Sequence, residues 1–204
     1  MLADTDVLKT LPARELAAGL YEVVKCGAIR SVPLLKFLER SLPDILAGSA
    51  PALTRTVVDA ARIKAAVVAR DELESAGRVI LNFGHTVGHA LETATGYRRF
   101  KHGEAVAWGM IAAARLSAYQ SGLSAGDQNR LVRLIHRVEA LPPLRGISRN
   151  RIWTAIQRDK KSDGGGLRMV LLSKLGRPEI VGDFDPIVLR RFLATFLEWR
   201  SDGG

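Results

Sequence analysis

The chain has 204 residues, 47% hydrophobic and 25% charged, which supports a buried core and excludes an intrinsically disordered protein. Its net charge of +9 points to a basic cleft for an anionic small molecule rather than to nucleic-acid binding. The basic residues are scattered among acids with no run of five or more, and aromatic residues, at 6%, are too few for base stacking. No apolar stretch approaches the roughly 20 residues that span a membrane, and a lone cysteine excludes an internal disulfide and fits a cytoplasmic protein.

The N-terminal half shows apolar residues at three- and four-residue spacing, which predicts amphipathic helices. Residues 1–12 look like the end of a connection between domains, and residues 13–204 should form the domain itself. After Gly77, the apolar run Val79-Ile-Leu81 leads into a His-rich segment that again has helical spacing. The helices predicted before that segment are Arg14 to Leu46, broken near Ser31-Val-Pro, and Pro51 to Glu74.

The C-terminal half contains the only change of period. Residues Leu167 to Leu172 and Glu179 to Val181 alternate with a period of two and predict a β-hairpin. The βαβ alternation of a parallel sheet is absent, so we predict a mainly α, multi-helical domain with one small β-hairpin. The helices predicted in this half are Ala105 to Gln120, Asp127 to Ala140, Ser148 to Gln157 and Asp185 to Arg200.

Three of the four histidines, His85, His89 and His102, fall within 18 consecutive positions. On one helix, His85 and His89 would share a face, with Asn82 one turn ahead of them and Arg78 another turn back. His102 should lie on a loop that can return to the same place. Such a cluster is typical of a metal-assisted proton-transfer site, although a capping or core histidine would also explain the spacing.

Glu22 is the candidate for an acidic ligand. A catalytic zinc commonly takes two His and one carboxylate, with one position open. Glu22 lies in the apolar stretch Ala17 to Val24, where an unpaired charge would be costly, and Lys25 follows on the same helix face. An exposed Glu–Lys pair would explain both residues equally well, so the residues alone leave both interpretations open.

Two other polar segments have a structural and a functional interpretation. Lys64, Asp71-Glu-Leu-Glu74 and Arg78 could line a site or form a solvated helix end. The tract Arg158-Asp-Lys-Lys-Ser-Asp-Gly-Gly-Gly166 could offer backbone N–H groups to a phosphate, but it matches neither a Walker loop nor G-x-G-x-x-G. A flexible turn before the hairpin is the favoured interpretation of that tract.

With these residues identified, the chain resembles the C-terminal domain of the 3-dehydroquinate synthase family. The matching blocks follow the family's order and spacing over essentially the whole chain. They are Leu11-Pro-Ala-Arg-Glu15, Gly19-Leu-Tyr-Glu-Val-Val-Lys-Cys-Gly27, Lys64 through Asp71-Glu72, Leu81-Asn-Phe-Gly-His-Thr-Val-Gly-His-Ala90, His102-Gly-Glu-Ala-Val106 and Arg158-Asp-Lys-Lys161.

The resemblance implies a role for each matching residue. Glu22, His85 and His102 would bind Zn²⁺ or Co²⁺. His89 would lie beside the substrate and transfer a proton, and Asn82 and Glu74 would hydrogen-bond to the substrate. The carboxylate, hydroxyl and phosphate groups of the substrate would be held by basic residues, namely Lys25, Lys64, Arg78, Lys160 and Lys161.

The resemblance also implies a lyase of the shikimate pathway, in aromatic amino acid biosynthesis. The family converts the seven-carbon sugar phosphate DAHP into 3-dehydroquinate and releases phosphate. NAD⁺ transiently oxidises one substrate hydroxyl, and zinc acts as a Lewis acid on that oxygen.

The chain departs from the family in one respect. The family places an NAD-binding domain ahead of this one, whereas this sequence starts at the connection and has no Gly-rich turn after a strand. We therefore expect the NAD⁺ site to lie on a missing domain or chain, and metal binding to be a firmer expectation than turnover by this chain alone. The interface left exposed would favour a homo-oligomer. The alternatives are a related inosose or valiolone synthase, or a non-catalytic remnant that acts as a partner subunit.

Overall fold

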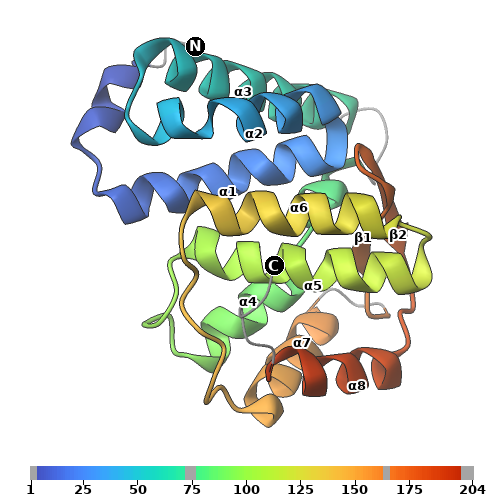
Figure 1. Ribbon diagram of the computed structural model, residues 1–204. Coiled ribbons are helices and arrows are strands. Elements are labelled where there is room, and N and C mark those ends of the chain that lie inside the picture. Colours follow the sequence, from blue (N-terminus) through green and yellow to red (C-terminus); the bar gives the residue numbers. More distant parts are fainter. Residues whose placement is uncertain (1–3, 72–76, 163–165, 199–204) are drawn as a thin grey trace.

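The computed structural model describes residues 4–71, 77–162 and 166–198, without the side chains of residues 70, 71 and 159–162. Within these residues the prediction of a mainly helical fold with one small hairpin is confirmed (Figure 1). The elements are η1 (Thr5–Thr10), α1 (Ala13–Arg30), α2 (Val32–Leu46), α3 (Ala50–Asp71), η2 (Gly77–Asn82), α4 (His85–Ala94), α5 (His102–Gln120), α6 (Ala125–Val138), α7 (Arg149–Ser162), β1 (Met169–Lys174), β2 (Arg177–Val181) and α8 (Pro186–Phe196).

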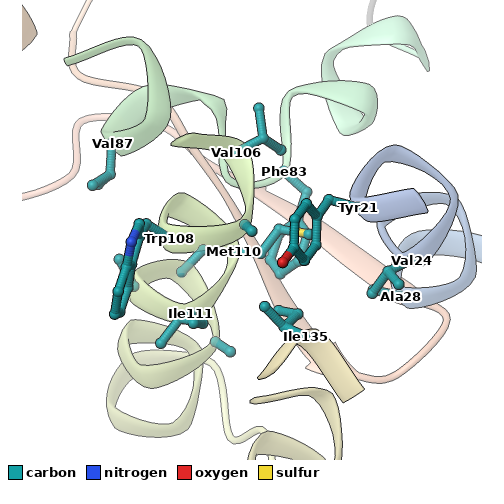
Figure 2. Close-up of a cluster of buried hydrophobic side chains, with 14 of the residues drawn as sticks. Tyr21, Val24, Ala28, Phe83, Val87, Val106, Trp108, Met110, Ile111 and Ile135 are labelled. Carbon is teal, nitrogen blue, oxygen red and sulfur yellow. The ribbon is translucent and has the colours of Figure 1, made fainter. Parts of the chain in front are cut away.

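Helix α5 is the centre of the fold. Every residue from 103 to 114 is buried, and the helix packs against α1, α4, α6 and β1. Figure 1 shows α1, α2 and α3 together on one side of it, and α4, α7 and α8 toward the other. Figure 2 shows the resulting core, in which Tyr21 and Val24 of α1 lie near Met110 of α5 and Ile135 of α6. None of the described helices is both long and apolar enough to cross a membrane.

Two glycines allow α5 to approach its neighbours with almost no separation. A Cβ atom at Gly103 would lie 2.0 Å from the carbonyl oxygen of Ala18 on α1. A Cβ atom at Gly109 would lie 1.8 Å from the carbonyl oxygen of Gly84, just before α4. Any other residue at these positions would collide with backbone, so the glycines set the distance of α5 from both helices.

The hairpin is attached to the helices by backbone groups. The backbone N–H of Leu172 in β1 donates to Ser117 Oγ of α5 at 2.9 Å. The N–H of Gly176, in the turn between the strands, donates to the carbonyl oxygen of Ala28 in α1 at 2.7 Å. Gly176 has φ of +82°, a conformation that favours glycine. The hairpin therefore closes one end of the contact between α1 and α5.

The predicted helix breaks are mostly confirmed, and the ends differ where capping decides them. Ser31 separates α1 from α2, and its Oγ accepts from the N–H of Leu34. Helix α6 begins at Ala125 rather than Asp127 because Ser124 caps it, and Asp185 caps α8, which starts at Pro186. Each strand starts two residues away from its predicted position. The predicted helix ends at residues 74 and 200 lie outside the described residues.

Replacement of Gly109 by alanine should lower the free energy of unfolding by about 1–3 kcal/mol or more, because the added methyl group meets the backbone at Gly84. The matched control is Gly19→Ala on α1, where a Cβ atom meets nothing within 4 Å. That change should instead stabilise by roughly 0.5–1 kcal/mol through helix propensity. Urea unfolding of both variants checks this, and equal stability of the two would contradict the close-contact argument.

Candidate metal and substrate site

Three residues that are far apart in the sequence meet beside the contact of α1, α4 and α5. Glu22 lies in the third turn of α1, His85 is the first residue of α4 and His102 is the first residue of α5. One potential ligand atom from each lies within 4.8 Å of the others. The ring centroids of His85 and His102 are 5.4 Å apart. Two imidazoles and one carboxylate at this spacing form a donor set suited to zinc.

The segment that carries His85 is not the continuous helix that the spacing predicted. The 3₁₀ helix η2 ends at Asn82, and Gly84 then turns the chain with φ of +84° before α4 starts at His85. Glycine is needed at this turn because a Cβ atom here would lie 2.8 Å from the backbone N of Met110 in α5. Arg78 and Asn82 therefore belong to η2 rather than to the helix of His85, which corrects the prediction.

His102 was predicted on a loop and instead begins α5. Glu104, the third residue of the helix, accepts the N–H of Lys101 through Oε2 at 2.8 Å and so caps the first turn. Nδ1 of His102 lies 3.3 and 3.4 Å from the two carboxylate oxygens of Glu92 on α4. A metal-binding imidazole commonly has such a carboxylate on its other nitrogen, which fixes the ring and its tautomer.

The carboxylate of Glu22 presents its two oxygens to different groups. Oε2 accepts from Nζ of Lys25 at 2.9 Å and lies 3.5 Å from Nζ of Lys64. Oε1 is buried, has no hydrogen-bond partner within the described part of the chain, and lies 4.0 Å from Nε2 of His85. A buried acceptor without a donor is costly, and a cation between Oε1 and the imidazoles would satisfy it.

Burial and neighbouring charges keep His85 and Glu22 in the protonation states that bind a metal. Burial and, after it, the charge of Lys25 lower the pKa of His85 to about 4, so its imidazole is neutral. Burial alone would raise the pKa of Glu22, but the positive charges of Lys25 and Lys64 hold it below its usual value. Metal ligands must be deprotonated, and Glu22 and His85 meet this condition near neutral pH.

Lys25 decides between the two interpretations of the Glu–Lys pair. Its side chain is only 3% exposed and that of Glu22 is 23% exposed, so this is not a solvated surface pair. Burial lowers the pKa of Lys25 and the neighbouring Glu22 carboxylate opposes that effect. Lys64, on α3, is 47% exposed and approaches the same carboxylate from the solvent side.

His89 lies at the rim of the cluster, between two cavities. Its ring centroid is 5.1 Å from that of His85 and 5.9 Å from that of His102. One cavity, of about 240 Å³, is lined by His89, His85, Asn82 and Arg168 among others. The second, of about 520 Å³, also contains His89 and His102 and is lined by Arg158 of α7. An exposed imidazole between two cavities can exchange protons with a bound ligand.

Sequence reasoning missed Glu92, although a signal for it was present. It is a carboxylate within an apolar helical stretch, the same feature that identified Glu22, and it is 8% exposed. With His89 and His102 it forms a second group whose ligand atoms lie within 4.8 Å of one another. His102 thus belongs to both of the possible metal groups found among the described residues. Arg168, just before β1, was also missed, because only the tertiary structure brings the hairpin to His89.

The remaining predicted site residues are placed as follows. Lys25, Lys64 and Asn82 lie at the cluster or at a cavity beside it, and Arg78 is exposed on η2. Glu74 and the side chains of Lys160 and Lys161 lie outside the described residues. The backbone at 160 and 161 belongs to α7, the helix whose Arg158 lines the larger cavity.

Comparison with known proteins identifies a family to which this sequence is similar. Residues 19–162 match the family described as 3-dehydroquinate synthase C-terminal. The 3-dehydroquinate synthase of Teredinibacter turnerae is 45% identical over 195 residues, which cover 95% of this chain and 54% of that protein. That of Neisseria gonorrhoeae is 42% identical over 200 residues, which cover 97% of this chain and 55% of that protein. The chain thus spans about half the length of the curated relatives it matches.

Solved structures of related cyclases share the fold. A 2-epi-5-epi-valiolone synthase from Streptomyces hygroscopicus, solved with NAD⁺ and Zn²⁺, aligns with a TM-score of 0.81 at 24% identity, covering 96% of this chain and 54% of that one. A 2-deoxy-scyllo-inosose synthase, solved with carbaglucose-6-phosphate, NAD⁺ and Co²⁺, aligns with a TM-score of 0.79 at 27% identity, covering 94% of this chain and 55% of that one. Together with the sequence relatives, these matches show that the chain belongs to the 3-dehydroquinate synthase family, through its C-terminal domain.

Proposed function

We propose that this chain forms the metal- and substrate-binding half of a 3-dehydroquinate synthase, a lyase of the shikimate pathway that converts DAHP into 3-dehydroquinate with release of phosphate. The observation that carries the proposal is the meeting of Glu22, His85 and His102 beside two cavities. The relatives at 42% and 45% identity that bear this name favour it over an inosose or valiolone synthase, since the aligned cyclase structures are 24% and 27% identical.

Zn²⁺ or Co²⁺ would be held by Glu22, His85 and His102. The unpartnered Oε1 of Glu22 and the neutral imidazole of His85 fit a divalent cation. When bound, the metal supplies Lewis acidity to a substrate hydroxyl oxygen. Glu92 would keep the ring of His102 oriented through Nδ1, leaving the other nitrogen for the metal.

The other residues of the chain would bind the substrate and move its protons. Lys25 and Lys64 keep Glu22 ionised and present positive charge to anionic substrate groups. Asn82 and Arg168 line the smaller cavity with His89, so a substrate there would contact both. His89, exposed between the cavities, would take or return a substrate proton. Arg78, Glu74, Lys160 and Lys161 would complete the polar lining.

NAD⁺ would bind to a separate domain or chain, because the described helices and hairpin provide no parallel sheet with a Gly-rich turn. This division of labour fits the relatives, in which the matched region is about half of the protein. Substrate would then lie between the metal half and the nucleotide half. A homo-oligomer and a cytoplasmic location remain part of the proposal.

The metal assignment is tested by zinc content per chain after dialysis against trace zinc. The unaltered chain should retain about one zinc, His85→Ala should lose it, and His89→Ala should retain it. These two variants distinguish the two possible metal groups, because His85 belongs to one and His89 to the other. Circular dichroism should show that both variants keep the helical fold. Zinc retained by His85→Ala and lost from His89→Ala would reassign the metal to the group containing Glu92.

The reaction is tested by mixing the zinc-loaded chain with the N-terminal half of the Teredinibacter turnerae relative and NAD⁺. DAHP should yield 3-dehydroquinate, detected by chromatography, and free phosphate, measured by a phosphate assay. His89→Ala should lower kcat roughly 10²- to 10⁴-fold, the usual contribution of general acid–base catalysis, with zinc retained. Glucose 6-phosphate offered in parallel is the control. Turnover of that hexose phosphate instead of DAHP would favour an inosose synthase.

A further inference from the structure

We infer that the ion pair between Arg14 and Glu104 is a positioning device for the metal site, one that holds the first turn of α5, and with it His102, against the helix that carries Glu22. The inference rests on the metal site proposed above. Neither residue is a candidate ligand or lines either of the two cavities described above, and both would act through the backbone of the α5 turn that carries His102.

The geometry of the pair is that of a two-pronged clamp. Glu104 Oε1 accepts from Nε of Arg14 at 2.5 Å, and Oε2 accepts from Nη2 of Arg14 at 2.7 Å. The same Oε2 accepts the backbone N–H of Lys101 at 2.8 Å. The Glu104 side chain is 6% exposed. A fork of two charge-assisted hydrogen bonds to a buried carboxylate is both strong and directional.

The position of the clamp links it to the metal ligands. Arg14 is in the first turn of α1, two turns before Glu22, and Glu104 is two residues after His102. Glu104 also binds the N–H of the residue immediately before His102. The ion pair therefore connects the helix of one candidate ligand to the helix turn that begins with another.

The contact between α1 and α5 needs such a clamp because it lacks interlocking side chains at this point. Gly103 lies flat against the carbonyl of Ala18 and has no side chain to fix the sliding of one helix along the other. Two further contacts hold the residues just before α5. Nη2 of Arg14 donates to the carbonyl oxygen of Arg99 at 3.2 Å, and Nζ of Lys101 lies 2.5 Å from Oε1 of Glu15. All these contacts come from the first turn of α1.

A loosened clamp should act on metal affinity more than on folding. Groups that orient metal ligands without touching the metal typically change affinity 10- to 100-fold when replaced. A site whose ligands come from separate helices tolerates only small shifts of each ligand. Loss of the clamp would let the first turn of α5 move, and His102 would move with it.

The fold provides a matched control in the pair Arg130–Glu39. Nε and Nη2 of Arg130 donate to the two carboxylate oxygens of Glu39 at 2.6 and 2.8 Å, so the chemistry is the same. This pair joins α6 to α2, and neither helix carries a candidate ligand. It reproduces the general cost of breaking a partly buried fork between two helices.

The test is a Co²⁺ titration of the full chain, in which binding is monitored by the visible ligand-field absorption of the metal. Arg14→Met and Glu104→Gln should bind Co²⁺ 10- to 100-fold more weakly than the unaltered chain, with altered absorption bands. Arg130→Met and Glu39→Gln should leave affinity and bands unchanged despite lower thermal stability. Arg14→Lys should recover only part of the affinity, since lysine keeps the charge but not the fork.

Each outcome bears on the inference. Arg14→Met and Arg14→Lys leave Glu104 in place to accept the N–H of Lys101, and they change a side chain that is 48% exposed. They should therefore provide folded variants if Glu104→Gln does not fold. Folded Arg14 variants with unchanged Co²⁺ affinity would overturn the positioning role and leave the proposed metal site standing. Equal weakening in the Arg130 and Glu39 variants would overturn it as well, by showing a general effect of stability. No Co²⁺ binding by the unaltered chain would overturn the proposed metal site and, with it, the positioning role.

Discussion

The close backbone contact of α5 with α1 and with the start of α4 is the constraint on which the site depends. Gly103 meets Ala18 and Gly109 meets Gly84 at distances that leave no room for a side chain. Because Glu22, His85 and His102 come from these three helices, the two glycine contacts also set the distances between the candidate ligands. Helix packing with larger residues would separate the axes by a further side-chain layer and open the cluster. Core packing and site geometry are thus one structural feature here.

The charged side chains around this contact are arranged in partnered groups. Lys25 neutralises one oxygen of Glu22 and leaves the other facing His85. Glu92 faces Nδ1 of His102, and Glu104 joins the backbone of the same helix turn to Arg14. Buried carboxylates without such partners would be costly. The excess of positive charge in the whole chain has a local counterpart in Arg158 and Arg168, each of which lines one of the cavities, and in Lys64 beside Glu22.

Sequence patterns were sufficient for the helices and for the chemistry of the donors. Sequence patterns predicted helices over α1 to α8, and the alternation from Leu167 predicted the hairpin, because each element shows its pattern locally. The predictions failed at helix starts. His102 was expected on a loop because the capping by Glu104 depends on side-chain geometry, and Asn82 was placed on the helix of His85 because the spacing cannot show the left-handed turn at Gly84.

By itself, the sequence determined a mainly helical chain, a hairpin near its end, and a set of histidines and acids suited to a metal. Only the tertiary structure decided which of them meet. In the folded chain Lys25 is buried rather than part of an exposed pair. Glu92 lies beside Nδ1 of His102, and Arg168 lines a cavity together with His89. The reason is physical: periodicity reports which face of an element is apolar, whereas contacts between elements depend on where backbones approach, and here two glycines decide that.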